Sequence, residues 1–164
     1  MAGSVERFES RLAAAGLINR VVRLNDDTRT AELAAQALGT AVGAIVKSLV
    51  VLADGVPVLA MVSGDRRARL PDLAQILGVQ TVVMARGAAV KEFTGFAIGG
   101  IPPLLEDQEG NRFRAIMDRE FLRYDEIWAA AGSPFAVFPI HPGELERLTG
   151  AQLTDFTDPI VPAV

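Results

Sequence analysis

Residues 94–103 read Thr-Gly-Phe-Ala-Ile-Gly-Gly-Ile-Pro-Pro. We expect a short strand, Phe96–Ile98, that runs into two glycines and then two prolines. Glycine tolerates positive φ and close approach to the backbone, whereas proline fixes φ and removes an N–H. Such a segment could aim the N–H groups of Gly99, Gly100 and Ile101 at one point, as a cradle for an anion or a carbonyl oxygen. The plainer interpretation, a strand followed by a tight turn, stays open on these residues alone.

A second unusual feature is Lys47, which interrupts the apolar run 44–52. The run is typical of a buried strand, and a lysine within it must either reach water or meet a negative group. Lys47 is therefore either an edge-strand lysine whose ammonium extends to solvent or a cationic anchor for a ligand.

Composition narrows the class of protein. The chain has 164 residues, 50% of them hydrophobic, with a formal net charge of −4, one histidine and no cysteine. This length predicts one domain, 1–164. No apolar run reaches the ~18 residues of a membrane span and the first residues do not resemble a signal peptide, so we expect a cytoplasmic protein without a membrane partner. The acidic balance argues against DNA and broad nucleic-acid binding, but not against a local contact with an RNA end.

Hydrophobic periodicity predicts the following elements. The expected helices are 5–15, 30–38, 70–77, 88–93 and 142–148, and the expected strands are 17–24, 44–52, 56–62, 81–84, 113–117 and 135–140. Asp54-Gly55 is a hairpin signal, and 124–131 fits either helix or strand.

Helices and strands alternate, but hairpins interrupt the alternation. This pattern predicts a mixed α/β (α+β-like) single domain around one sheet, with its core at about 5–156 and a loose tail at 157–164. Residues 64–69 are expected to form a charged loop, in which Arg66, Arg67 and Arg69 either contact phosphates at an RNA end or are simply solvated.

Lys47 and the glycine-proline segment together resemble the YbaK/EbsC family of aminoacyl-tRNA deacylases, which are related to the editing domain of prolyl-tRNA synthetase. The resemblance covers roughly residues 8–156. It is carried by Ile-Val-Lys-Ser-Leu-Val at 45–50, by a Gly-x-x-x-Pro element at Gly99 and Pro103, and by Glu-Ile-Trp-Ala-Ala-Ala-Gly at 126–132. It implies a partly open, barrel-like mixed sheet packed with helices, in which 126–131 is a strand that lines the pocket.

The resemblance also implies site residues. Lys47 would hold the terminal adenosine phosphate or the polar end of the substrate, and Gly99 and Gly100 would supply amides to the ester carbonyl, as the catalytic set. The implied substrate-binding residues are Ile101, Pro103, Ala131, Gly132 and Ser133. The chain departs from its relatives at 131–135. It has Ala131-Gly132 where some members have a Gly-Gly pair, and the three residues that follow also differ. The amino acid that the site would remove from tRNA therefore stays open.

The function implied is a trans-editing hydrolase that deacylates a mischarged aminoacyl-tRNA, with tRNA(Pro) carrying a small non-cognate amino acid as the leading substrate. The 3′ end of the tRNA would be the partner, with prolyl-tRNA synthetase as a further candidate. Two alternatives remain: a non-catalytic module that binds an aminoacyl or nucleotide group, and a hydrolase of small aminoacyl esters that ignores the tRNA.

The chemistry needs no nucleophilic side chain, because an aminoacyl ester is already activated and positioning with preorganised donors accelerates its hydrolysis. We expect His141 to cap a helix, and Ser48 and Ser133 to be satisfied hydroxyls rather than nucleophiles, since no base is placed beside either. With one histidine and no cysteine, we expect no metal site and no cofactor.

Overall fold

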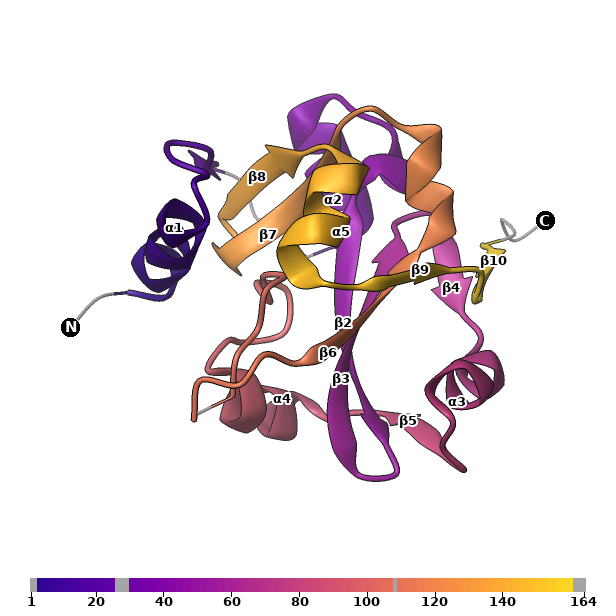
Figure 1. The fold of residues 1–164 in the computed structure, drawn as a ribbon. Helices are drawn as coiled ribbons and strands as arrows, with labels where there is room; N and C mark the ends of the chain where they lie inside the picture. Colours follow the sequence, from indigo (N-terminus) through magenta and orange to yellow (C-terminus); the bar gives the residue numbers. More distant parts are fainter. Residues whose placement is uncertain (1–2, 26–29, 108, 161–164) are drawn as a thin grey trace.

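A computed structural model describes residues 3–25, 30–107 and 109–160. Its central sheet has five strands in the order β5-β2-β3-β6-β9 (Figure 1). These strands are β2 (Val46–Ala53), β3 (Val56–Ser63), β5 (Val82–Met84), β6 (Arg114–Asp118) and β9 (Gln152–Thr154). β2 pairs with β3 and β5 in antiparallel fashion, whereas β6 is parallel to both β3 and β9.

The predicted hairpin between β2 and β3 is confirmed. Asp54 and Gly55 have φ values of 47° and 84°. Positive φ at both central residues is the requirement of a type I′ turn, whose twist matches that of the strands it joins. The hairpin fixes the register in which Lys47 lies opposite Val62 and Ser48 opposite Met61.

Two smaller sheets flank the central one. The first has the antiparallel order β1-β8-β7, from β1 (Val22–Arg23), β8 (Ala136–Ile140) and β7 (Ile127–Ser133). The second pairs β4 (Arg66–Ala68) with β10 (Thr157–Pro159). Figure 1 shows α1 (Ser4–Ala14) packed outside β7 and β8, where the rings of Phe8 and Phe138 lie 5.3 Å apart.

The other helices begin and end as their sequence signals predict. They are α2 (Ala31–Leu38), α3 (Leu70–Leu77), α4 (Gly87–Thr94) and α5 (Pro142–Thr149), with 3₁₀ turns at Val42–Ala44 and Arg119–Arg123. Thr30 Oγ1 accepts the N–H of Leu33 at the start of α2. His141 Nδ1 accepts the N–H of Gly143 at the start of α5, so its capping role is confirmed.

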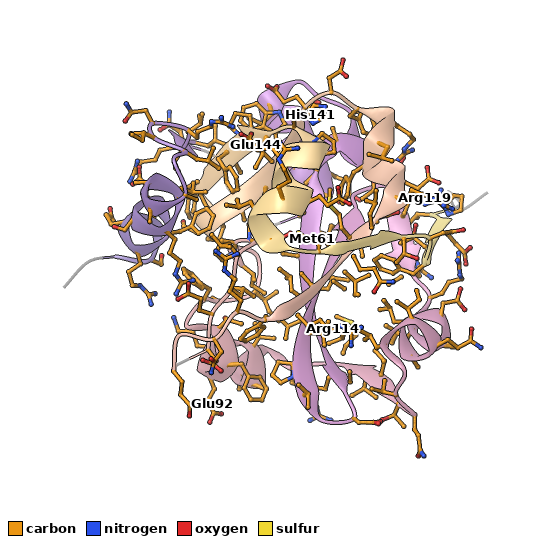
Figure 2. The ribbon with its side chains drawn as sticks, viewed as in Figure 1. Met61, Glu92, Arg114, Arg119, His141 and Glu144 are labelled. Carbon is orange, nitrogen blue, oxygen red and sulfur yellow. The ribbon has the colours of Figure 1, made fainter. Side chains whose placement is uncertain are left out.

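The expected mixed α/β domain is confirmed, and its core fills both faces of the central sheet. Met61, fully buried on β3, lies near the middle of the molecule in Figure 2. The strand expected at 126–131 is present as β7. Within the described residues, no helix has the length and apolar character that crossing a membrane would require.

Four local expectations were wrong. Phe96–Ile98 is not a strand, because Thr94 Oγ1 accepts the N–H of Phe96 and turns the chain directly after α4. The strand expected at 17–24 is reduced to β1. The charged loop 64–69 contains β4, which pairs with a strand at 157–159, where a loose tail was expected; residues 161–164 of that tail lie outside the described part.

The β4–β10 pair is tied to the central sheet by Asp118, a fully buried carboxylate at the end of β6. Its oxygens accept the N–H of Ser63 at 3.0 Å, the N–H of Glu120 at 3.0 Å and the hydroxyl of Thr157 at 3.1 Å. Through these hydrogen bonds Asp118 joins β3, β6 and β10 at one point.

We expect Asp118→Ala to lower the free energy of unfolding by about 2–4 kcal/mol, because it leaves buried donors of Ser63 and Thr157 without an acceptor. Urea denaturation followed by circular dichroism measures the change. Asp125→Ala, which removes the same group from an exposed position, is the matched control and should change stability by less than about 0.5 kcal/mol. Equal midpoints for the two variants would contradict the role given to Asp118.

Candidate functional site

A cavity of about 360 Å³ lies where β2, β7, α2 and the loop after α4 meet. Its wall is mostly small and apolar, with Ala31, Ala34, Ile45, Ile98, Ile101, Trp128, Ala129, Ala130 and Val137. Four polar residues also line it, namely Thr30, Glu32, Lys47 and Ser48. An apolar hollow with a few polar groups is the usual form of a small-ligand site.

The cavity lies beside an edge of β2 that is only partly paired. β3 pairs with the whole of β2 on one side, but β5 pairs only with Val51, Leu52 and Ala53 on the other. Val50 O accepts the N–H of Ala85 on that second edge. Because N–H and C=O groups alternate between the edges of an antiparallel strand, Ser48 directs its own N–H and C=O toward the same edge as Val50. β7 reaches the start of this edge through a bridge between Ile45 and Trp128, and no strand pairing of the described chain involves Ser48 there, so the cavity borders the main-chain donor and acceptor of Ser48.

Lys47 lines this cavity and is half-buried. Its Nζ donates to the carbonyl oxygen of Arg66 at 2.5 Å, so the ammonium is held in place by β4. Burial lowers the pKa of Lys47 below its ordinary value, while the carboxylate of Glu32 opposes this shift and the charge of Arg67 adds to it. An ammonium has three N–H donors, which leaves two for a ligand.

The glycine-proline loop meets the cavity through Ile98, Gly99 and Ile101. Gly99 has a φ of 94°, a conformation that glycine adopts without strain. The amides of Gly99 and Ile101 have no hydrogen-bond partner in the described chain. The amide of Gly100, by contrast, donates to Ala97 O at 3.1 Å, and Gly100 does not line the cavity. The expected cradle of three amides is therefore reduced to two.

Gly100 has a packing role instead. A Cβ at this position would lie 2.7 Å from the Cα of Ser133, closer than real Cβ atoms approach backbone. The absence of a side chain thus lets the loop lie directly against the end of β7.

Two arginines of α1 hold the same loop from outside, a feature that the sequence reasoning missed. Arg7 donates to Gly95 O at 3.1 Å and Arg11 donates to Leu104 O at 3.4 Å. Both guanidinium groups also lie over the ring of Phe96, at 4.9 and 5.8 Å from its centroid. Their spacing of four residues on one helix is the signal that could have linked them.

Of the residues expected to bind the substrate, Ile101 lines the cavity, whereas Pro103, Ala131, Gly132 and Ser133 are not part of its lining. Pro103 and Ala131 are buried, and a Cβ on Gly132 would lie 2.6 Å from Ser4 O of α1. Ser133 Oγ accepts the N–H of Phe135 in the turn after β7. The part of β7 that lines the cavity comes earlier, at Trp128–Ala130.

Of the three clustered arginines, Arg66 and Arg69 bind other parts of the protein, whereas Arg67 is exposed. Arg66 donates to the hydroxyl and the carbonyl oxygen of Thr157 at 2.7 and 2.8 Å. Arg69 contacts the carboxylates of Asp72, Asp155 and Asp158, so these two side chains bind the C-terminal strand. Arg67 is exposed, has no ion-pair partner among the residues described, and lies near enough to Lys47 to affect its pKa.

Ser48 Oγ is buried and has no hydrogen-bond partner in the described part of the chain. The hydroxyl was expected to be satisfied, so that expectation was wrong. An unpaired buried hydroxyl costs about 1–3 kcal/mol, and such groups in native proteins often belong to functional sites.

We expect Gly100→Ala to destabilise the protein by about 1–3 kcal/mol, because its methyl group meets backbone atoms of Ser133 that cannot rotate away. Thermal unfolding measures this change. Gly87→Ala is the matched control, since a Cβ there meets only Ile98 Cδ1 at 3.4 Å and Gly87 lies in the first turn of α4. A melting temperature for Gly100→Ala as high as that of Gly87→Ala would show that the loop does not depend on this contact.

Comparison with known proteins shows which proteins this chain resembles. Residues 25–148 match the family model of the aminoacyl-tRNA editing domain. The multifunctional Ser/Thr-tRNA deacylase ProXp-y of Escherichia coli is 31% identical over 161 residues, which cover 94% of each chain. A crystal structure described as a candidate trans-editing enzyme for prolyl-tRNA synthetase superposes with a TM-score of 0.85 at 40% identity, over 96% of this chain and 99% of that one.

The proline–tRNA ligase of Geobacter sulfurreducens is 38% identical over 76 residues, which are 46% of this chain. The matched segment is only 13% of that ligase, so the chain corresponds to a small part of such enzymes. The family model itself covers most of the chain. The chain therefore belongs to the family of aminoacyl-tRNA editing domains, as its strand lysine and glycine-proline loop had indicated.

Proposed function

We propose that this protein is a free-standing aminoacyl-tRNA deacylase, which hydrolyses the ester of a mischarged tRNA in the cytoplasm. One observation carries the proposal: Lys47 and Gly99, which come from distant parts of the sequence, line the same cavity. An ammonium fixed in position can bind the phosphate of the substrate, and unpaired backbone amides can bind the carbonyl oxygen of its ester.

Each group has a role in this reaction. The ammonium of Lys47 binds the phosphate of the terminal adenosine, using N–H donors that Arg66 O leaves unused. The amides of Gly99 and Ile101 stabilise the negative charge that develops on the carbonyl oxygen as water adds to the carbonyl carbon. The bond to the ribose oxygen then breaks, this oxygen takes a proton, and the amino acid leaves as a carboxylic acid. A ribose hydroxyl of the substrate itself orients the attacking water.

No side chain of the described cavity serves as a nucleophile in this scheme. The imidazole of His141 caps α5, and Ser133 Oγ accepts from a turn amide. Ser48 lacks the neighbouring base that would activate a hydroxyl. Water held close to a preorganised ester is sufficient, because correct positioning alone supplies a large effective concentration.

The size and wall of the cavity favour a small amino acid. The wall is rich in alanine, and about 360 Å³ must also hold part of the terminal ribose. The leading substrate is tRNA(Pro) that carries a small non-cognate amino acid. Similarity to the candidate trans-editing enzyme for prolyl-tRNA synthetase supports the tRNA, and similarity to the Ser/Thr-tRNA deacylase supports a small amino acid. The exposed Arg67 beside the cavity is suited to a phosphate of the acceptor end.

We expect the protein to deacylate at least one member of a panel of mischarged tRNAs, and Lys47→Ala to reduce kcat/KM by at least about 100-fold through loss of the phosphate anchor. Release of radiolabelled amino acid from each tRNA measures the rate. Lys91→Ala is the matched control, because Lys91 is the other lysine of the chain and lies on α4 in an exposed position. Its rate should stay within about twofold of the parent protein.

Two results would overturn the proposal. The first is full activity of Lys47→Ala, and the second is no turnover of any pair. If the protein binds an aminoacyl-adenosine analogue without hydrolysing any ester, it is a binding module. If it hydrolyses aminoacyl-adenosine as fast as aminoacyl-tRNA, the tRNA body is not recognised.

A further inference from the structure

The cavity contains one carboxylate that the proposed hydrolysis does not use. Glu32 lines the cavity from the first turn of α2, and its side chain is exposed. It forms no ion pair within the part of the chain that the structure describes. Its charge nevertheless acts on the ammonium of Lys47, whose pKa it raises against the effect of burial. Glu32 and Lys47 therefore place opposite charges in one hollow.

Ser48 adds neutral acceptors to the same hollow. The residue is partly exposed although its Oγ is fully buried, so its accessible surface belongs to the main chain or Cβ. The C=O of Ser48 faces the unpaired edge of β2, as argued above from the contact between Ala85 and Val50. A ligand donor that enters this edge would take the position of a neighbouring strand, where it could donate a hydrogen bond to the Ser48 carbonyl oxygen.

The charges match those of an aminoacyl ester at the end of a tRNA. Such a group carries a phosphate on one side of the ester and an α-ammonium on the other, separated by a few bonds. Lys47 suits the phosphate, whereas a carboxylate and a carbonyl oxygen are acceptors suited to the three N–H donors of an ammonium. No positively charged side chain other than Lys47 lines the cavity in the described part of the chain.

We propose that Glu32 and the main-chain carbonyl of Ser48 bind the free α-ammonium of the substrate, so that the cavity selects aminoacyl esters with an unblocked amine and rejects N-acylated ones. The inference rests on the proposed function, because it names the substrate class of the same site. N-acylation removes the positive charge and two of the three donors, and it adds a group that must fit beside Ala31 and Ala34 in the wall.

The test uses two non-hydrolysable amides, 3′-alanylamino-3′-deoxyadenosine 5′-phosphate and its N-acetyl derivative. Isothermal titration calorimetry measures the affinity of the whole protein for each. We expect the free amine to bind at least about tenfold more tightly than the acetylated form, a difference equivalent to one charge-assisted contact. Glu32→Gln should reduce this preference to about threefold or less, mainly by weakening binding of the free amine.

Glu92→Gln is the matched control, since Glu92 is an exposed glutamate on α4 that does not line the cavity and lies at the lower edge of the molecule in Figure 2. It should retain the full preference. Equal affinities for the two amides, or an unchanged preference in Glu32→Gln, would overturn the inference.

Hydrolysis assays separate this inference from the proposed function. A protein that deacylates free and N-acetylated Ala-tRNA at equal rates would be a deacylase that does not recognise the amine. A protein that prefers the free amine in the binding assay but hydrolyses neither tRNA would bind as inferred and lack the proposed activity.

Discussion

The site depends on the unequal pairing of the two edges of β2. β3 covers one edge along the whole strand, whereas β5 covers only Val51–Ala53 on the other. Backbone groups without partners are costly when buried, so the uncovered segment must meet either solvent or a ligand. Here it borders a cavity that β7, α2 and the glycine-proline loop close. The arrangement exposes main-chain donors and acceptors inside a largely apolar hollow, where hydrogen bonds are stronger than in bulk water.

The position of the lysine follows from contacts made far along the chain. Lys47 donates to Arg66 O on β4, and β4 is held in place by β10. The hydroxyl of Thr157 on β10 accepts a hydrogen bond from the guanidinium of Arg66 and donates one to the buried carboxylate of Asp118. The ammonium is thus oriented by a network rather than left to extend freely into water. Lys47 therefore differs from an ordinary edge-strand lysine, whose charged end would be fully solvated.

The sequence could predict features that depend on local rules. Lys47 was recognised because a charge is rare in an apolar strand, and the hairpin and helix ends followed from Asp54, Gly55 and the capping residues. The sequence could not show that Ala131–Ser133 lie outside the cavity lining, because β7 changes register between Ala130 and Ser133, which the alternation of residues does not reveal. Glu32 was missed because an exposed glutamate in a first helical turn is ordinary, and only tertiary packing brings it to the cavity. The β4–β10 pair joins residues about 90 apart, beyond any local pattern.

The central claim is that an aminoacyl ester lies between the uncovered segment of β2 and the glycine-proline loop. Mapping of backbone amide shifts by ¹H–¹⁵N NMR during titration with an aminoacyl-adenosine amide tests it most directly. The account predicts that the largest changes occur at the amides of Ser48, Gly99 and Ile101. Changes centred instead on the separate groove of about 380 Å³ that Arg112 and Arg147 line, with those three amides unmoved, would contradict it.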